Sequence, residues 1–360
     1  MAGAKRGNPM KNILKDADRK LYEAGKSISF FAVNPVNESR EKKRFFSSRN
    51  YEPQFRYAPY RTHIPTIIEN LNRIKTNSSY MGRILKHKRE NHIKRLNMLA
   101  SRGTEDFTRN ALKIYGKPNK ILIKKAKRML RYQPEKRKTE KLSPKEVVDI
   151  LKQALRTYGF EWEVKQKLIT ANAAVQQSKK TVFVKKGKKF SNDFIKRLIS
   201  HEIGTHVLRY ENGLLQPYLI FAAGLPGYLE TEEGLAVVNE EASGVLSKTT
   251  LKTYAGRVIA VSTALDNSFR ETYKRMRENF SKDIAWKLTV RAKRGISDTS
   301  LPGGLTKDYK YLNGYFKVKN YLKRYSINRL YYGKVSLHYA KTMDRIPDLA
   351  EPRYLPARGK

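Results

Sequence analysis

Apolar residues in the first hundred positions recur mainly at helical spacing. The first such segment carries them three or four positions apart, at Leu14, Ala17, Leu21 and Ala24. This spacing places them on one face and predicts an amphipathic helix. Residues 64–74 and 81–99 follow a similar pattern, and Thr104 is placed to cap a further helix. Residues 34–61 carry three prolines without this period, so we expect a loop there.

Strand patterns interrupt the helical period in the middle of the chain. Ser143, a proline and then Glu146 form the sequence of a capping box, which predicts a helix start. After this helix, residues 162–169 and 181–185 are predicted to form two strands. Residues 176–180 are expected to be the turn between them.

Helical patterns return in the second half of the chain. Ser191 or Asn192 is expected to cap a helix whose apolar face leads to residue 201, and Thr231 to cap a later helix. A glycine-rich loop at residues 297–306 and a proline-containing tail from residue 346 complete the pattern. Together these elements predict a mainly α-helical chain with a few strands, of class α+β.

The composition excludes several classes of protein. The 360 residues are 39% hydrophobic and include 22 Tyr and 14 Phe, enough to build a substantial core. The lack of cysteine excludes disulfides, cysteine-ligated zinc and a thiol nucleophile, and it fits a reducing compartment. No apolar run approaches the roughly 18 residues of a membrane span, and no secretory signal is expected. A mitochondrial presequence remains open.

The formal net charge is +42, from 75 Lys and Arg against 33 Asp and Glu. Such a surface attracts polyanions, with an affinity that falls as salt is added. Nucleic acid, an acidic protein tail and an anionic membrane are all candidate partners. A host whose whole proteome is basic would give the same charge without a specific partner.

Residues 198–206 read LISHEIGTH and contain the residue types of a catalytic zinc site. Such a site uses three protein ligands and a fourth position for water, with a glutamate beside the first histidine as base. His201 and His206 are five positions apart, which an ideal helix would separate by about 140°. A π-bulge near Gly204 would bring both imidazoles to one side. The candidate acidic third ligands are Glu230, Glu232, Glu233, Glu240 and Glu241.

The chain resembles the QEGLA-motif metallopeptidases, the family that includes the microtubule-associated tyrosine carboxypeptidases. The central matching motifs are HEIGTH, the GLPG turn at residues 224–227 and TEEGLA at residues 231–236. Further matching blocks extend over roughly residues 15 to 325; they are RGT, FT and YGKP at residues 102–118, FRE at 269–271, RG at 294–295, and LTKD, YL and G at 305–314.

The resemblance implies a role for each matching residue. His201 and His206 match the histidine ligands of zinc, Glu202 the general base, and Glu233 the glutamate ligand. The family glutamine of QEGLA is Glu232 here, and its effect beside the metal remains open. The implied fold is a helical metallopeptidase of the glutamate-zincin kind, with a small β-sheet edging the active-site cleft.

The predicted division is a basic, mostly helical region at residues 1–140, a catalytic domain at 141–343 and a basic tail at 344–360. We expect a cytoplasmic zinc peptidase, specifically a carboxypeptidase that removes a C-terminal residue, tyrosine among the candidates, from an acidic protein tail. An exopeptidase also needs a cation for the terminal carboxylate, and the candidates are Arg209, Arg294 and Lys307.

Two alternatives remain open. The first is endopeptidase cleavage by the same site. The second is a basic protein that binds nucleic acid or the ribosome on a metallopeptidase scaffold. Its basis is the lysine- and arginine-rich run at residues 120–141.

Overall fold

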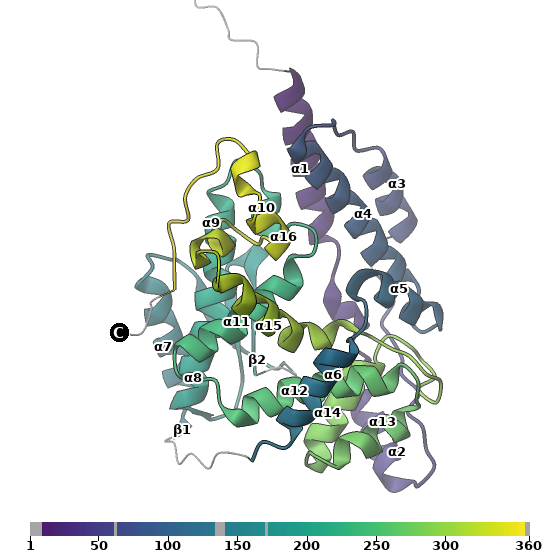
Figure 1. The fold of residues 1–360 in the computed structure, drawn as a ribbon. Helices are drawn as coiled ribbons and strands as arrows, with labels where there is room; N and C mark the ends of the chain where they lie inside the picture. Colours follow the sequence, from purple (N-terminus) through teal and green to yellow (C-terminus); the bar gives the residue numbers. More distant parts are fainter. Residues whose placement is uncertain (1–8, 61–62, 134–140, 170–171, 357–360) are drawn as a thin grey trace, which may run out of the picture. The chain divides into compact units, whose positions relative to one another are not determined.

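The structure, a computed structural model, describes residues 9–60, 63–133, 141–169 and 172–356. It is mainly α-helical with two small sheets, as predicted. The chain forms two compact units (Figure 1): the first contains Met1–Pro134 and Lys248–Asn313, the second Glu135–Ser247 and Gly314–Lys360. Each unit therefore combines two separate stretches of sequence. The predicted division into three functional parts is not tested by these boundaries.

The first unit is built from helices. Its amino-terminal stretch contains α1 (Pro9–Lys26), η1 (Phe30–Val33), α2 (Glu38–Ser47), α3 (Ile64–Asn72), α4 (Tyr80–Ala100), α5 (Asp106–Tyr115) and α6 (Lys120–Leu130). The second stretch contributes α12 (Lys248–Ala264), α13 (Phe269–Arg277), α14 (Lys282–Lys293) and η4 (Lys307–Tyr309), and α15 (Lys310–Leu322) begins there. Helix α12 packs along α6, so residues more than a hundred positions apart share one core.

Helix α2 corrects the prediction of a continuous loop over residues 34–61. The helix lies between two of the three prolines and places Phe45 in an aromatic core with Phe269 and Trp286. Its Glu41 is fully buried and accepts hydrogen bonds from the Tyr51 hydroxyl and from a backbone amide. Tertiary burial of one aromatic face therefore stabilises a helix in a proline-rich stretch.

The basic run is described only in part. Helix α6 buries Leu122, Ala126 and Leu130 and leaves most of its lysines exposed, while residues 134–140 lie outside the described part of the chain. Within the described residues, no helix is long and apolar enough to cross a membrane.

The second unit contains all the described strands. Its elements before the site are β1 (Lys141–Leu142), α7 (Pro144–Arg156), β2 (Glu163–Lys167), β3 (Ala173–Gln176), η2 (Gln177–Lys179), β4 (Thr181–Lys185), β5 (Phe190–Ser191) and α8 (Asn192–Leu198). They are followed by the π-helix η3 (Ile199–Val207), α9 (Leu208–Leu214), α10 (Ile220–Ala223), α11 (Tyr228–Ala242), the end of α15, η5 (Ile327–Tyr331), α16 (Leu337–Ala340) and η6 (Met343–Arg345). After η6, the described chain has no helix or strand, as expected for the tail.

The main sheet differs from the predicted hairpin. Its order is β2-β4-β3, with β2 parallel to β4 and β3 antiparallel to β4. The predicted turn exists, with Lys180 at a φ of 44°, but it joins β4 to β3 rather than to β2. Because a third strand intervenes, the two predicted strands run in the same direction. Strand β3 also contacts the π-helix, which places the sheet beside the site described below.

Of the predicted helix caps, two are confirmed and two are wrong. Ser143 forms the full capping box with Glu146, and Ser191 caps α8. The Thr104 hydroxyl instead donates to the Ser101 carbonyl, and α5 begins after Glu105. Helix α11 begins at Tyr228, three residues before Thr231, because Gly227 adopts a left-handed conformation at the end of the GLPG turn.

Candidate metal centre

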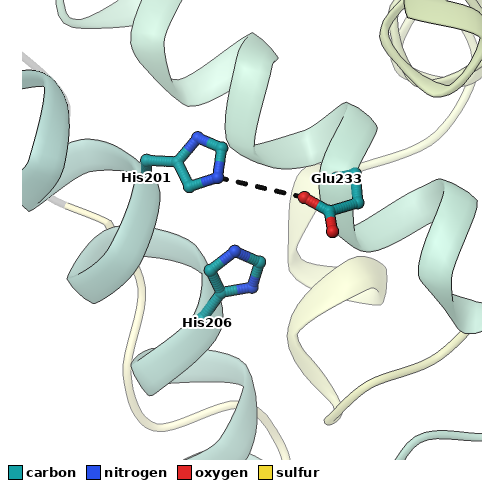
Figure 2. A group of neighbouring side chains, drawn as sticks. All are labelled: His201, His206 and Glu233. Carbon is teal, nitrogen blue, oxygen red and sulfur yellow. Dashed lines mark ion pairs between the residues drawn. The ribbon is translucent and has the colours of Figure 1, made fainter. Parts of the chain in front are cut away.

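One continuous helical run and α11 supply the candidate ligands. The π-helix η3 follows α8 directly, continues into α9, and carries His201, Glu202 and His206. Helix α11 packs against this π-helix and carries Glu232 and Glu233. Figure 2 shows both imidazoles and the Glu233 carboxylate pointing toward a common point.

The π-helix confirms the backbone distortion that the histidine spacing predicts. All nine residues from Ile199 to Val207 have π-helical hydrogen bonding. A π-helix has more than four residues per turn, so residues five apart come close to one face. The ring centroids of His201 and His206 are 5.1 Å apart, with the ring planes inclined by 67°.

His201, His206 and Glu233 each offer one ligand atom, and these atoms lie within 4.8 Å of one another. The Nε2 atom of His201 is 3.9 Å from a carboxylate oxygen of Glu233. Of the five glutamates considered from the sequence, Glu233 is the one that this cluster includes. Two imidazoles and one carboxylate form a donor set that suits zinc.

The other nitrogen of each imidazole is held by a carboxylate. His201 Nδ1 lies 2.7 Å from Glu240 Oε1, and His206 Nδ1 lies 2.9 Å from Glu232 Oε1. Carboxylates in this position fix the orientation of a ligating imidazole and increase its basicity. With Nδ1 engaged, Nε2 is the nitrogen that each ring presents to a metal.

Glu232 and His206 are hydrogen-bonded partners in a buried environment. Burial alone would raise the pKa of Glu232, but the ammonium of Lys334, 3.7 Å from Oε1, together with His206 holds that pKa well below its usual range. Burial alone would lower the pKa of His206, and the carboxylates of Glu232, Glu202 and Glu233 raise it instead. These carboxylates make the space between the imidazoles favourable for a cation.

The site therefore fits a zinc ion on its own chemistry. Its donors are nitrogen and oxygen atoms, as the absence of cysteine requires. The structure also explains how Glu232 is accommodated: its charge is opposed by Lys334, which donates a hydrogen bond to Gln177 as well. Glu202 follows His201 directly on the π-helix and is partly exposed. Its predicted role as base is not tested by these contacts.

The three predicted substrate cations lie in different surroundings. Arg209, in the second unit, is completely buried and donates to the carbonyls of Leu330, Gly333 and Val335. Such bonds are typical of a structural arginine. Arg294 and Lys307 belong to the first unit. The substrate roles of all three stay predictions.

Arg294 and Lys307 both contact other residues of the first unit. Arg294 is 8% exposed, donates to Asn34 Oδ1 at 2.6 Å and lies 3.6 Å from Asp308. The ammonium of Lys307 lies 4.7 Å from the centre of the Phe30 ring.

Sequence reasoning missed several residues that support the site. Glu240 was considered as a ligand and instead holds His201, which its position seven residues after Glu233 on α11 makes possible. Lys334, Tyr331 and Asn239 also support the site, and no motif marks them. Lys334 and Tyr331 lie more than 90 residues after Glu240 in the sequence.

A family model described as microtubule-associated tyrosine carboxypeptidase matches residues 43–359. A protein from Rattus norvegicus named Microtubule-associated tyrosine carboxypeptidase 1 is 34% identical over 133 residues, covering 35% of this chain and 27% of the relative. The protein of the same name from Homo sapiens gives the same identity and coverage. The matched stretch thus spans less than a third of the length of these relatives.

Proposed function

The chain belongs to the microtubule-associated tyrosine carboxypeptidase family, and on this basis we propose that it is a zinc-dependent carboxypeptidase. We propose further that it removes one residue, tyrosine among the candidates, from the C-terminus of an acidic polypeptide. The observation that carries the proposal is the cluster of His201, His206 and Glu233, whose ligand atoms lie within 4.8 Å of one another.

Each residue has a defined part in the proposed reaction. Zinc, when bound, supplies a Lewis acid that polarises a carbonyl and makes water more acidic. His201, His206 and Glu233 hold the metal, while Glu240 and Glu232 keep the two imidazoles oriented. Glu202 takes a proton from the attacking water and delivers it to the leaving amine.

The charge of the chain supports an acidic substrate. A net charge of +42 draws a negatively charged peptide toward the protein and raises the association rate, an effect that salt screens. The proposed cytoplasmic location fits the names of the relatives, which describe them as microtubule-associated. No contact among the described residues favours nucleic acid over an acidic protein tail.

The test compares two acidic peptides of one sequence ending in tyrosine, one with a free C-terminus and one amidated. Mass spectrometry should show loss of the terminal residue from the free peptide alone, because a carboxypeptidase requires the terminal carboxylate. Cleavage inside both peptides would establish an endopeptidase. The proposal would be contradicted if zinc-loaded protein cleaved neither peptide and also cleaved none of a panel of peptides with other terminal residues.

A second pair of peptides, one acidic and one neutral, tests the proposed steering. Raising the salt concentration should lower kcat/KM for the acidic peptide more than for a neutral peptide with the same last residues. An equal response of both peptides would remove the acidic tail from the proposal and leave the carboxypeptidase assignment intact.

A further inference from the structure

The π-helix that carries both histidines leaves one carbonyl without its usual helical partner. The Leu208 amide donates to the carbonyls of Ile203, five residues earlier, and of Thr205, and an α-helix resumes at Leu208. At such a point the backbone amides change from bonding the carbonyl five residues earlier to bonding the carbonyl four residues earlier. One carbonyl then receives no backbone amide. The carbonyl passed over here belongs to Gly204, the residue after Ile203.

Two side chains from outside the helix satisfy that carbonyl. The Tyr331 hydroxyl donates to the Gly204 oxygen at 2.7 Å, and the Asn239 amide lies 3.3 Å from the same oxygen. Asn239 also lies 2.8 Å from the Tyr331 hydroxyl and 2.8 Å from Thr205 Oγ1. Thr205 in turn donates to the Ser200 carbonyl at 3.2 Å.

These groups form a buried network at the middle of the π-helix. Tyr331 and Thr205 are completely buried, and Asn239 is 4% exposed. A buried carbonyl without a donor costs roughly 1–3 kcal/mol, so the widened turn depends on these bonds. Thr205 immediately precedes His206, and Ser200 immediately precedes His201. The network therefore acts on the backbone beside both histidines.

The segment that supplies Tyr331 is itself fixed to the same helical run. Arg209 Nε donates to the Leu330 and Gly333 carbonyls at 2.9 and 3.0 Å, and its Nη2 donates to the Val335 carbonyl at 2.6 Å. These carbonyls lie on both sides of Tyr331. Arg209 thus holds the tyrosine against Gly204.

We infer that Tyr331 and Asn239 are positioning residues for the metal site, acting through the Gly204 carbonyl. They fix the inserted residue between His201 and His206 and so keep both Nε2 atoms directed at one point. In an uninterrupted α-helix the two histidines would be about 140° apart. The inference rests on the proposed zinc site but assigns these two residues a role that the metal ligands do not fill.

The test is the substitution Tyr331→Phe, which removes only the hydroxyl. Its zinc dissociation constant, measured by competition with a chromogenic chelator, should rise by about tenfold, the effect of losing one buried hydrogen bond. The visible spectrum of the cobalt-substituted protein should also shift, because it reports ligand geometry. The matched control is Tyr309→Phe, which removes another buried hydroxyl that donates to a backbone carbonyl, in the first unit. The control should leave both readings unchanged.

A second variant covers the case in which Tyr331→Phe does not fold. Thr205→Val keeps the shape of the side chain and removes the hydroxyl beside Asn239; its zinc affinity should fall by a smaller factor, with a spectral shift. Unchanged affinity and spectrum in a folded Tyr331→Phe or Thr205→Val variant would overturn the inference. Wild-type protein that binds no zinc would instead contradict the proposed function, so the two failures are distinguishable.

Discussion

Each unit of the molecule contains a carboxylate buried against nitrogen-bearing side chains, and of these two arrangements only one can hold a metal. In the second unit, Glu232 is 3% exposed and lies between Lys334 and His206. In the first unit, Asp308 is 1% exposed and is paired with Arg291 and Arg294. In both units these neighbours hold the pKa of the carboxyl well below its usual range, against the raising effect of burial.

The difference lies in whether the side chain that contacts the carboxylate can still bind a metal. A guanidinium has donors only and no lone pair for a metal. Imidazole bonded through Nδ1 keeps Nε2 as a ligand. The Asp308 group therefore stabilises the fold, while the Glu232 group orients a ligand. Among the described residues, His201, His206 and Glu233 are the cluster with metal-ligand spacing.

The largest expected effect is on catalysis in the second unit. Glu202→Gln should lower kcat by about 10²- to 10⁴-fold, because it removes the proposed proton acceptor while keeping the side-chain shape. Steady-state kinetics measures the loss of kcat. Elemental analysis measures the zinc content, which should not change. The exposed Glu163 in the same unit provides the control, Glu163→Gln, with activity like wild type. Undiminished turnover by zinc-loaded Glu202→Gln would rule out this base.

The next effect is on stability in the first unit. Asp308→Asn leaves Arg291 and Arg294 without their counter-ion and should lower the free energy of unfolding by about 3–5 kcal/mol. Denaturant titration measures this, and zinc content should stay at the wild-type level. The control Asp283→Asn breaks an exposed pair with Lys42 and should leave the free energy of unfolding nearly unchanged, because water screens an exposed pair. Equal losses for both variants would contradict the stabilising role of the buried group.

The lowered pKa of Asp308 also predicts that the free energy of unfolding depends on pH. Burial raises the pKa of Asp308, but Arg291, Arg294 and Arg257 outweigh it and lower the pKa in the folded state. The stabilisation is therefore complete above the unfolded-state pKa of about 4 and is lost as the pH falls below it. Unfolding free energies of wild type and Asp308→Asn should converge in acid. Parallel curves down to the lowest usable pH would contradict the lowered pKa.

A smaller effect is expected for the carboxylate that orients His206. Glu232→Ala should weaken zinc binding by about 10- to 100-fold, since it removes the acceptor for His206 Nδ1. Glu232→Gln should lose less, because its amide oxygen can still accept that hydrogen bond. Chelator competition measures both constants. The ranking would be contradicted if the two variants bound zinc equally well or if glutamine were the weaker of the two.

The smallest expected effect is the loss of a helix cap, and it should be the same in the two units. Helices α7 and α13 both begin with a serine–glutamate capping box, at Ser143 and at Ser268. Ser143→Ala and Ser268→Ala should each lower the unfolding free energy by about 1 kcal/mol, without changing zinc affinity. Denaturant titration and chelator competition provide the measurements. A change in zinc affinity for either variant would mean that the stability of the helix start controls the metal site.

Local sequence patterns predicted the features that depend on neighbouring residues in the chain, such as helix geometry and helix caps. The five-residue histidine spacing predicted a π-type distortion, which the structure shows as a π-helix, and Ser143 with Glu146 predicted the start of α7; both predictions are confirmed. Helix α2 was missed because its stability comes from packing Phe45 into an aromatic core. Strand β3 was missed because its pairing with β4 depends on the sheet as a whole.

The supporting residues of the site could not be predicted for the same reason. Lys334 and Tyr331 reach the site through the fold of a segment that Arg209 anchors by three backbone contacts. Their importance follows from the Gly204 carbonyl and the Glu232 carboxylate that they contact, and no linear motif links Tyr331 or Lys334 to these groups.

The most direct test of the account is the zinc content of purified protein, determined by elemental analysis after a high-salt wash. We predict about one zinc per chain in wild type and in Asp308→Asn, and almost none in the double variant His201→Ala/His206→Ala. A folded wild type that takes up no zinc when zinc is supplied would contradict the account. Zinc retained in full by the double variant would contradict it equally.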